Sequence, residues 1–214
     1  MGKSLLITRP ENDNTTYYLS RWSIQIIEEA KQKGIGVIDL YRDKANRKRV
    51  IGILEKRNPE LVFLNGHGGE DFVAGHDNKI ILKDSDGRAL RSKIICARAC
   101  KSAKVLGEKS INCGTVSYLG YKEDFVFWRD PASISNPLKD KTAELFLEPS
   151  NYLILSLLKG HSTGDADKKA KNLFRKNIRE LLIKGHSVEG YYFIKSLYWD
   201  MIHQICLGRE DATF

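Results

Sequence analysis

The sequence predicts an α/β fold in which a mainly parallel central sheet lies between layers of helices. Short apolar runs alternate with amphipathic stretches along the chain, and the links between them are short. The apolar runs have the length and composition of strands buried on both faces, which is typical of parallel sheets. With 214 residues, the chain can bury one good hydrophobic core. We therefore expect a single domain over residues 1–214.

Residues 1–60 are expected to form a β-α-β-α unit. The apolar residues of its first helix recur every four positions, and Gly34 ends that helix. The polar stretch 12–16 offers N-caps for it, and Asn58-Pro59 ends the second helix. The expected elements are strands at 4–8 and 35–41 and helices at 18–33 and 45–57.

Residues 61–142 are expected to hold the strands and loops that build a functional site. A small hairpin is predicted after the strand at 61–65, because two short apolar runs flank Gly75–Asn78. Two prolines and little periodicity predict a loop at 122–142, lying over the site. The other expected elements are strands at 93–97 and 114–120 and short helices at 88–92 and 102–108.

The segment 143–209 is expected to be helical. Asp165–Lys184 has the clearest pattern, with apolar residues on one face, lysines and arginines on the other, and Gly185 at its end. A helix at 143–159 precedes it. A third helix, rich in aromatic residues, is predicted at 188–207.

Two of the predicted strands end on residues that can do chemistry together. Leu61–Gly69 (LVFLNGHGG) delivers His67, and Lys93–Cys100 (KIICARAC) delivers Cys100. In parallel sheets, ligands bind outside the carboxyl ends of the strands. Neighbouring strands would therefore place both side chains on one rim, where an imidazole can activate a thiol for nucleophilic attack. The alternative is a plain glycine turn and a buried cysteine that only packs.

Backbone amides beside these two residues could stabilise the negative charge that develops on an attacked carbonyl. The Gly68 N–H has no side chain to block it, and Cys100 offers its own N–H at the strand end. These two amides are the candidate oxyanion hole. The glycines around His67 would let the backbone lie close to a substrate.

Both motifs resemble those of the caspase-like cysteine peptidases, which include caspases, metacaspases, legumain, gingipains, separase and CHAT proteins. The later segments GTVSYLGY and NYLILSLLKGHSTGDADKKAKNLF are most similar to the CHAT and gingipain branch, so that the resemblance covers about residues 61–184. It implies a caspase-like three-layer sandwich and a cysteine endopeptidase acting through an acyl-enzyme. It makes His67 the general base or acid and Cys100 the nucleophile. Arg98 departs from the small residue usual near the cysteine.

The resemblance also implies a protein or peptide substrate, and members of this group commonly hold a substrate side chain in a charged pocket. Glu123 and Asp124, just past the fifth long strand, are candidate acids for such a pocket, and Glu70 and Asp71 are others. The alternative for each is an exposed loop acid. We also expect that a protein partner or ligand could activate the enzyme by rearranging the loop at 122–142.

The formal charge of +8 allows a nucleic-acid partner, but a lysine-rich solvated surface explains it as well. No stretch interleaves basic and aromatic residues, and no phosphate-binding glycine loop follows a strand. We expect no metal, because the spacing of histidines and cysteines matches no standard zinc site, and no cofactor. No apolar run has the length of a membrane span, and Arg9 interrupts any signal-like segment, which favours a cytoplasmic protein with reduced cysteines.

Two alternative functions therefore remain beside the peptidase. One is a catalytically silent caspase-like module that binds other proteins. The other is a basic α/β protein that binds nucleic acid.

Overall fold

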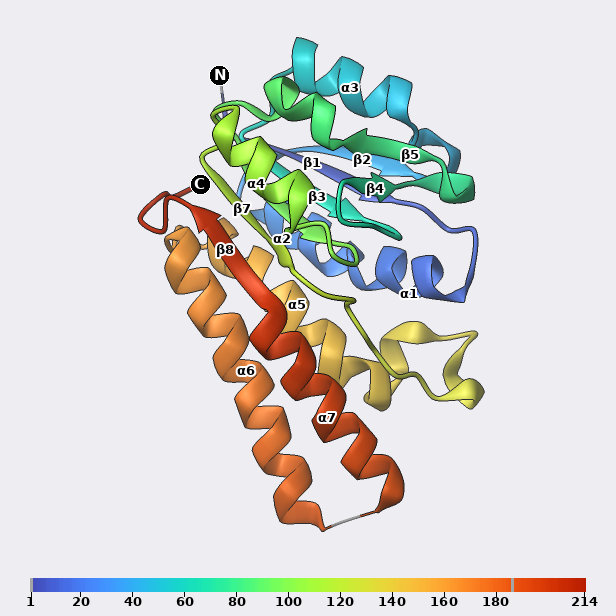
Figure 1. Cartoon of the computed structure of the whole chain (residues 1–214). Coiled ribbons are helices and arrows are strands. Elements are labelled where there is room, and N and C mark those ends of the chain that lie inside the picture. The colour runs from blue at the N-terminus through green and yellow to red at the C-terminus, as the bar shows by residue number, and fades with distance from the viewer. Residues whose placement is uncertain (1, 186) are drawn as a thin grey trace.

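A six-stranded sheet forms the centre of the computed structural model, which describes residues 2–185 and 187–214 (Figure 1). Five neighbouring strands run parallel, and the sixth pairs antiparallel at one edge. This confirms the predicted α/β class with a mainly parallel sheet. In spatial order the strands are β2 (Gly36–Tyr41), β1 (Ser4–Arg9), β3 (Leu61–Asn65), β6 (Ile94–Arg98), β7 (Ser117–Tyr121) and β8 (Gln204–Gly208).

Helices cover both faces of the sheet (Figure 1). One face carries α3 (Arg47–Lys56), α4 (Val105–Asn112) and the predicted hairpin of β4 (Phe72–Ala74) and β5 (Ile80–Lys83). The other carries α1 (Asn14–Trp22), α2 (Ile24–Gln32), α5 (Lys141–Leu158) and α6 (Thr163–Lys184). Helix α7 (Val188–His203) packs against α6, and the two helices extend beyond the sheet. No helix in the described ranges is long and apolar enough to cross a membrane.

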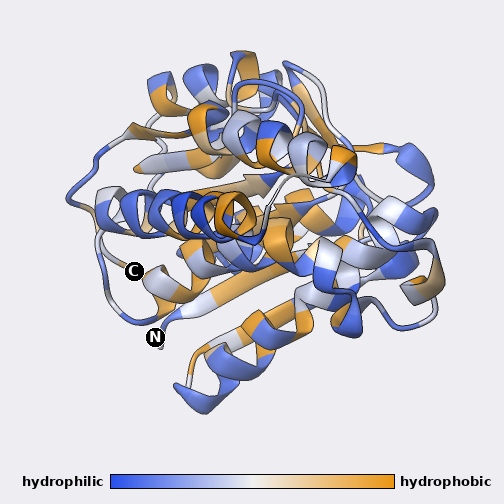
Figure 2. Cartoon of the chain, turned by 90° about the horizontal axis from the view of Figure 1, so that it is seen from below, coloured by the Kyte–Doolittle hydropathy of each residue, from blue (hydrophilic) through white to orange (hydrophobic). Residues whose placement is uncertain are grey.

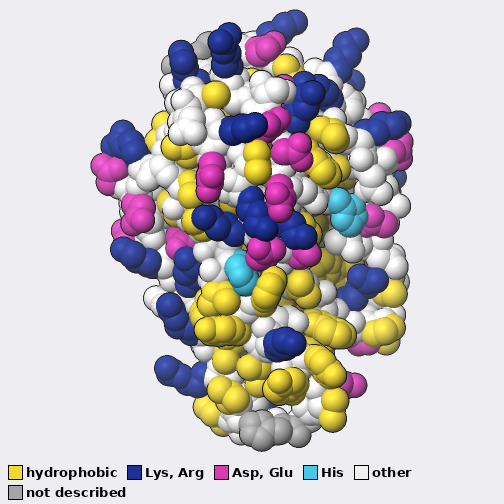
Figure 3. All heavy atoms as spheres, in the orientation of Figure 1, with side chains coloured by type: hydrophobic (Ala, Val, Ile, Leu, Met, Phe, Trp, Pro, Cys, Tyr) yellow, Lys and Arg dark blue, Asp and Glu magenta, His cyan; other side chains and the backbone are white. Residues whose placement is uncertain are grey.

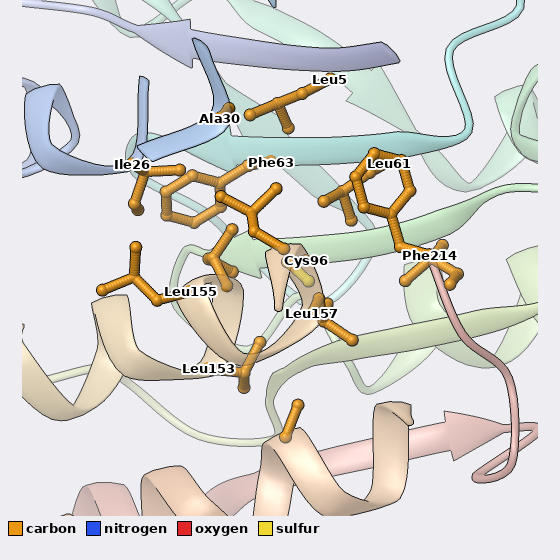
Figure 4. Packing of buried hydrophobic residues seen from close by; sticks show 14 of the residues in the cluster. Leu5, Ile26, Ala30, Leu61, Phe63, Cys96, Leu153, Leu155, Leu157 and Phe214 are labelled. Carbon is orange, nitrogen blue, oxygen red and sulfur yellow. The ribbon is translucent and has the colours of Figure 1, made fainter. Parts of the chain in front are cut away.

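The hydrophobic core lies in two layers because successive strand residues point to opposite faces. Leu5, Phe63 and Cys96 point toward α2 and α5, where they pack with leucines of α5 (Figure 4). Leu6 and Ile95 point the other way, toward α3 and α4. In Figure 2 the hydrophobic residues gather toward the middle of the molecule, and hydrophilic residues occupy the outward turns of the helices. Both faces of the sheet are therefore buried, as the composition of the strands predicted.

The first predicted helix is divided in two at Ser23. The Leu19 carbonyl accepts hydrogen bonds from the Ser23 hydroxyl and from the guanidinium of Arg98, which also reaches the Ser23 hydroxyl. A buried cation therefore takes up backbone and side-chain acceptors at the junction between α1 and α2. The periodicity of the apolar residues continues across the break, which is why the sequence alone predicts one helix.

The prediction of a helix over 188–207 is wrong in its last turn, and with it the expectation that 143–209 is wholly helical. Helix α7 ends at His203, and the next five residues form strand β8. Strand β8 pairs antiparallel with β7, and the side chain of its first residue, Gln204, is buried and bonded to Asp167 and Tyr121. The open edge of β7 offers backbone hydrogen bonds that a continued helix would leave unpaired.

Candidate active site

The strands that carry His67 and Cys100 lie side by side. Strands β3 and β6 pair in parallel, with Leu61 opposite Ile94 and Asn65 opposite Arg98, a constant offset of 33 residues. His67 and Cys100 have the same offset, so they lie at the same level just beyond the strand ends. A Cβ atom added at Gly68 would lie 2.6 Å from the carbonyl oxygen of Cys100 and 3.1 Å from its nitrogen. The backbones of the two segments are therefore in contact at one rim of the sheet.

The imidazole of His67 is held by a carboxylate from the start of helix α1. Its Nε2 lies 2.7 Å from Oδ2 of Asp13, and both side chains are about 40% exposed. Asp13 is also the N-cap of α1, where its other oxygen accepts from the backbone N–H of Thr16. Burial works to raise the pKa of Asp13, but the hydrogen bonds from Thr16 and His67 outweigh burial and leave it below its ordinary value. Asp13 is therefore held as an anion that orients the imidazole.

The thiol of Cys100 is half-buried under the segment that follows β7. Its Sγ lies 3.9 Å from the carbonyl oxygen of Phe125. Burial raises the pKa of the thiol above its ordinary value, and the nearby carboxylate of Asp124 acts in the same direction. Within the described part of the chain, no hydrogen bond joins the thiol to His67. In this arrangement the sulfur is protonated and directed at Phe125.

The two amides of the candidate oxyanion hole are unengaged. The extended segment after His67 pairs with β4 through the Gly69 N–H and the His67 carbonyl, which leaves the Gly68 N–H outside that ladder. Among residues 2–185 and 187–214, neither the Gly68 N–H nor the Cys100 N–H donates a hydrogen bond to the protein. Neither amide is therefore committed to an acceptor in the described structure.

The candidate substrate-binding acids lie beside the rim, and three of them are already paired. Glu123 and Glu70 both contact the ammonium of Lys104, at 2.9 and 3.3 Å. Asp124 lies 3.5 Å from the ammonium of Lys101. The ion pair with Lys104 lowers the pKa of Glu123. Asp71 is exposed, and its backbone carbonyl accepts from Asp84.

Two carboxylates near the site were not predicted as part of it. Asp13 lies in the polar stretch predicted to cap a helix. Strand β1, which precedes it, lies beside β3 and ends at the same rim, and this is the signal that places Asp13 near His67. Asp200 lies within a predicted helix, between the buried Leu197 and Met201, and is itself fully buried. A charged residue on the inward face of a helix is the signal in that case. Cys96 packs in the core among aliphatic side chains, as expected (Figure 4).

Comparison with solved structures identifies the architecture. The crystal structure of the Arg-specific cysteine proteinase gingipain R matches with a TM-score of 0.67 over 100% of this chain and 47% of that chain, at 13% identity. The fold is caspase-like. A complex of the pro- and mature domains of RgpB from Porphyromonas gingivalis matches with a TM-score of 0.65 over 99% of this chain and 48% of that chain, at 12% identity.

The chain thus shares the caspase-like fold with these structures. At 12–13% sequence identity, the similarity concerns the fold alone. This chain spans about half the length of the matched gingipain chains. No protein-family model matches the sequence, and no curated protein matches it. What the caspase-like fold does in this chain therefore has to be argued from its own residues.

Proposed function

We propose that the protein is a cysteine endopeptidase in which His67 and Cys100 act as a catalytic pair. The observation that carries the proposal is that an imidazole and a half-buried thiol follow two adjacent parallel strands at the same level, where the backbones at Gly68 and Cys100 are in contact. The matched solved structures are cysteine proteinases, which supports the same reaction class.

The proposed reaction proceeds through an acyl-enzyme. His67 removes the proton from the Cys100 thiol, and the sulfur attacks the carbonyl carbon of a peptide bond. The oxygen of the resulting tetrahedral intermediate is held by the N–H groups of Gly68 and Cys100. His67 then gives its proton to the leaving amine as the carbon–nitrogen bond breaks. Water, deprotonated by His67, hydrolyses the thioester and returns the thiol.

Asp13 is proposed as the residue that positions the base. Its hydrogen bond fixes the Nε2 side of the ring, so Nδ1 is the atom left to face a thiol or a leaving group. A carboxylate in this place also stabilises the imidazolium that forms when the thiol is deprotonated. A dyad held this way needs no metal or cofactor for any step.

Glu123 and Asp124 are proposed to meet a basic side chain of the substrate next to the scissile bond. Both follow β7 at the rim that carries Cys100. A bound basic side chain would replace Lys104 and Lys101 as their partners. Ion pairs at exposed positions contribute little to stability, so this exchange of partners costs little.

A silent caspase-like binding module is the second candidate, and one observation favours it. The thiol faces the Phe125 carbonyl, and burial raises its pKa, which is the opposite of what an active nucleophile requires. The two candidates differ in whether Cys100 can form a covalent bond with a substrate.

The test is hydrolysis of a mixed peptide library together with labelling by peptidyl electrophiles, followed by mass spectrometry. Peptidase function predicts that the wild type and the control Cys113→Ala cut the peptides and that Cys100→Ala and His67→Ala do not. It also predicts a peptidyl adduct on Cys100. The proposal fails if Cys100→Ala cuts as fast as Cys113→Ala, or if neither the wild type nor Asp200→Ala, which removes an acceptor that holds the segment next to Cys100, yields products or an adduct.

A further inference from the structure

Helix α7 holds the segment that covers Cys100. Four hydrogen bonds connect the helix to residues 122–128, and they span the carbonyl that faces the thiol. The pairs are the Lys122 N–H with the His203 carbonyl, the Trp199 indole N–H with the Asp124 carbonyl, the Val126 N–H with Asp200 Oδ1, and the Trp128 indole N–H with the Ser196 hydroxyl, each at 2.9 Å.

Aromatic rings hold the same segment on the side away from α7. The Phe125 ring packs on Tyr121 at the end of β7, with centroids 4.8 Å apart, and continues through Phe127 to Tyr18 of α1. The segment is therefore held between α7 and α1, and its Phe125 carbonyl lies against the sulfur of Cys100. A peptide that reaches the sulfur from this side has to displace the Phe125 carbonyl.

Asp200 is buried in an unfavourable environment in this arrangement. Its side chain is fully buried, its Oδ1 accepts from Val126, and its Oδ2 has no hydrogen-bond partner within the described residues. Burial raises the pKa of this carboxyl well above its ordinary value. A carboxyl buried with one oxygen unpaired costs free energy that exposure to water would recover. The closed arrangement is therefore held by specific bonds but carries a penalty of its own.

We propose that α7 is a latch on the candidate active site, in which Asp200 and Trp199 hold the 124–128 segment over Cys100 and its release opens the thiol to substrate. The inference rests on the proposed function, since it treats Cys100 as the nucleophile to be exposed. Asp200 and Trp199 act through the segment and touch no reacting atom, so they are gating residues. The latch residues lie next to each other on one helix, so that a small displacement of α7 would loosen both bonds together.

The experiment measures the alkylation rate of each cysteine by iodoacetamide, using peptide mapping by mass spectrometry. In Asp200→Ala the Val126 N–H loses its acceptor, and the rate at Cys100 is expected to rise about tenfold, the worth of one buried hydrogen bond. Asp200→Asn keeps an oxygen for Val126 and is expected to stay within about twofold of the wild type. Trp199→Phe removes only the indole donor and should raise the rate about threefold.

Lys195→Ala is the matched control, because Lys195 is exposed on the same helix, and Cys113 at the end of α4 is the internal reference for global opening. The latch is overturned if Asp200→Ala leaves the Cys100 rate unchanged, or if Asp200→Asn raises it as much as Asp200→Ala. If Asp200→Ala raises the alkylation rate of Cys113 as much as that of Cys100, the whole fold has loosened, and Trp199→Phe becomes the deciding variant. An unchanged Cys100 rate in Trp199→Phe would then overturn the latch. Faster alkylation without any peptide hydrolysis would support the latch and count against the peptidase.

Discussion

A single carboxylate, Asp13, connects the start of helix α1 to the candidate base. One of its oxygens caps the helix and the other holds His67, so that any change at this position tests two roles at once. Asparagine is as good an N-cap as aspartate, but it carries no charge to stabilise an imidazolium. The two roles can therefore be separated by choosing the replacement.

We predict that Asp13→Asn lowers the rate of peptide hydrolysis about tenfold or more, with a change in stability below about 0.5 kcal/mol. Asp13→Ala should lower the rate similarly and also cost about 1 kcal/mol of unfolding free energy, because the cap is lost. Rates and urea unfolding curves for both variants check this. Equal rates for Asp13→Asn and the wild type would remove Asp13 from the site.

Asp200 provides a prediction about pH and stability. Its folded-state pKa lies above its unfolded value, which is about 3.9. The stability it contributes is therefore fully present below the unfolded pKa and is lost as the pH rises through the folded pKa. Asparagine at this position has no charge to bury and keeps an acceptor for Val126.

We therefore predict that the difference in Tm between Asp200→Asn and the wild type moves in favour of the variant as the pH is raised from about 4 to 8. Thermal unfolding across this range measures it, with Asp165→Asn as the control, since Asp165 is exposed on α6. A Tm difference that is constant over the range, or that moves in favour of the wild type as the pH rises, would contradict the assignment of Asp200 as a buried carboxyl that is kept protonated.

At the scale of elements, the turn after β3 depends on the close approach of two backbones. A Cβ at Gly68 would meet the Cys100 carbonyl at 2.6 Å and the Ala99 Cβ at 2.9 Å, distances at which one segment has to move. Gly52, in the middle of α3, has open space around its Cβ position. The two glycines therefore predict opposite outcomes for the same substitution.

Gly68→Ala is predicted to destabilise the fold by about 2 kcal/mol and to slow any chemistry at Cys100, because the rim is forced apart. Gly52→Ala is predicted to stabilise it by about 0.5–1 kcal/mol, because alanine is the better helix former. Denaturant unfolding of both variants checks the pair. If Gly68→Ala is as stable as the wild type, the two strand ends are not packed as described.

Most elements were predictable from local pattern, whereas the errors arose where distant segments compete for hydrogen bonds. The apolar runs at 61–65 and 93–97 indicate buried strands, and their common offset carries over to His67 and Cys100. By contrast, nothing local in 204–208 shows that β7 has an open edge to fill. Asp200 was not predicted at the site for the same reason: it accepts a hydrogen bond from Val126, which is 74 residues away in the sequence.

At the scale of the whole molecule, Arg98 joins parts of the chain that are remote in sequence. Its guanidinium is buried and donates to Asn65 in β3, to Asn151 in α5 and to the junction between α1 and α2. Burial lowers the pKa of Arg98 to about 9, which still leaves it charged at neutral pH. The departure from a small residue in the ARAC motif thus has a structural reason that the motif alone did not reveal.

Removing this cation leaves several buried acceptors unpaired at once. We predict that Arg98→Met costs about 3 kcal/mol or more of unfolding free energy. Arg98→Lys should recover only part of the loss, because an ammonium lacks the planar fork that reaches all three elements. Arg88→Met, at an exposed position, is the control for removing a surface arginine. An Arg98→Met variant as stable as Arg88→Met would show that Arg98 does not hold the elements together.

One face of the molecule is divided between a charged part and a hydrophobic part. Figure 3 shows acidic and basic side chains mixed over the upper part of one face, and hydrophobic side chains gathered over the lower part, where α6 and α7 extend from the sheet. The exposed hydrophobic residues near the free end of that pair are Leu182, Ile183, Val188, Tyr191 and Tyr192. The mixing of charges on this face fits a solvated surface better than a continuous site for a polyanion.

His67 and Cys100 are proposed to form one chemical unit, and the pH dependence of Cys100 alkylation tests this most directly. Rates at Cys100 and Cys113 would be followed by mass spectrometry in the wild type, His67→Ala, the latch variant Asp200→Ala and the double variant, each between pH 5 and 9. We predict that at neutral pH Cys100 is alkylated about tenfold more slowly in the double variant than in Asp200→Ala, because His67 no longer helps to deprotonate the thiol. The rate at Cys113 should be the same in both. Identical Cys100 profiles with and without His67 would contradict it.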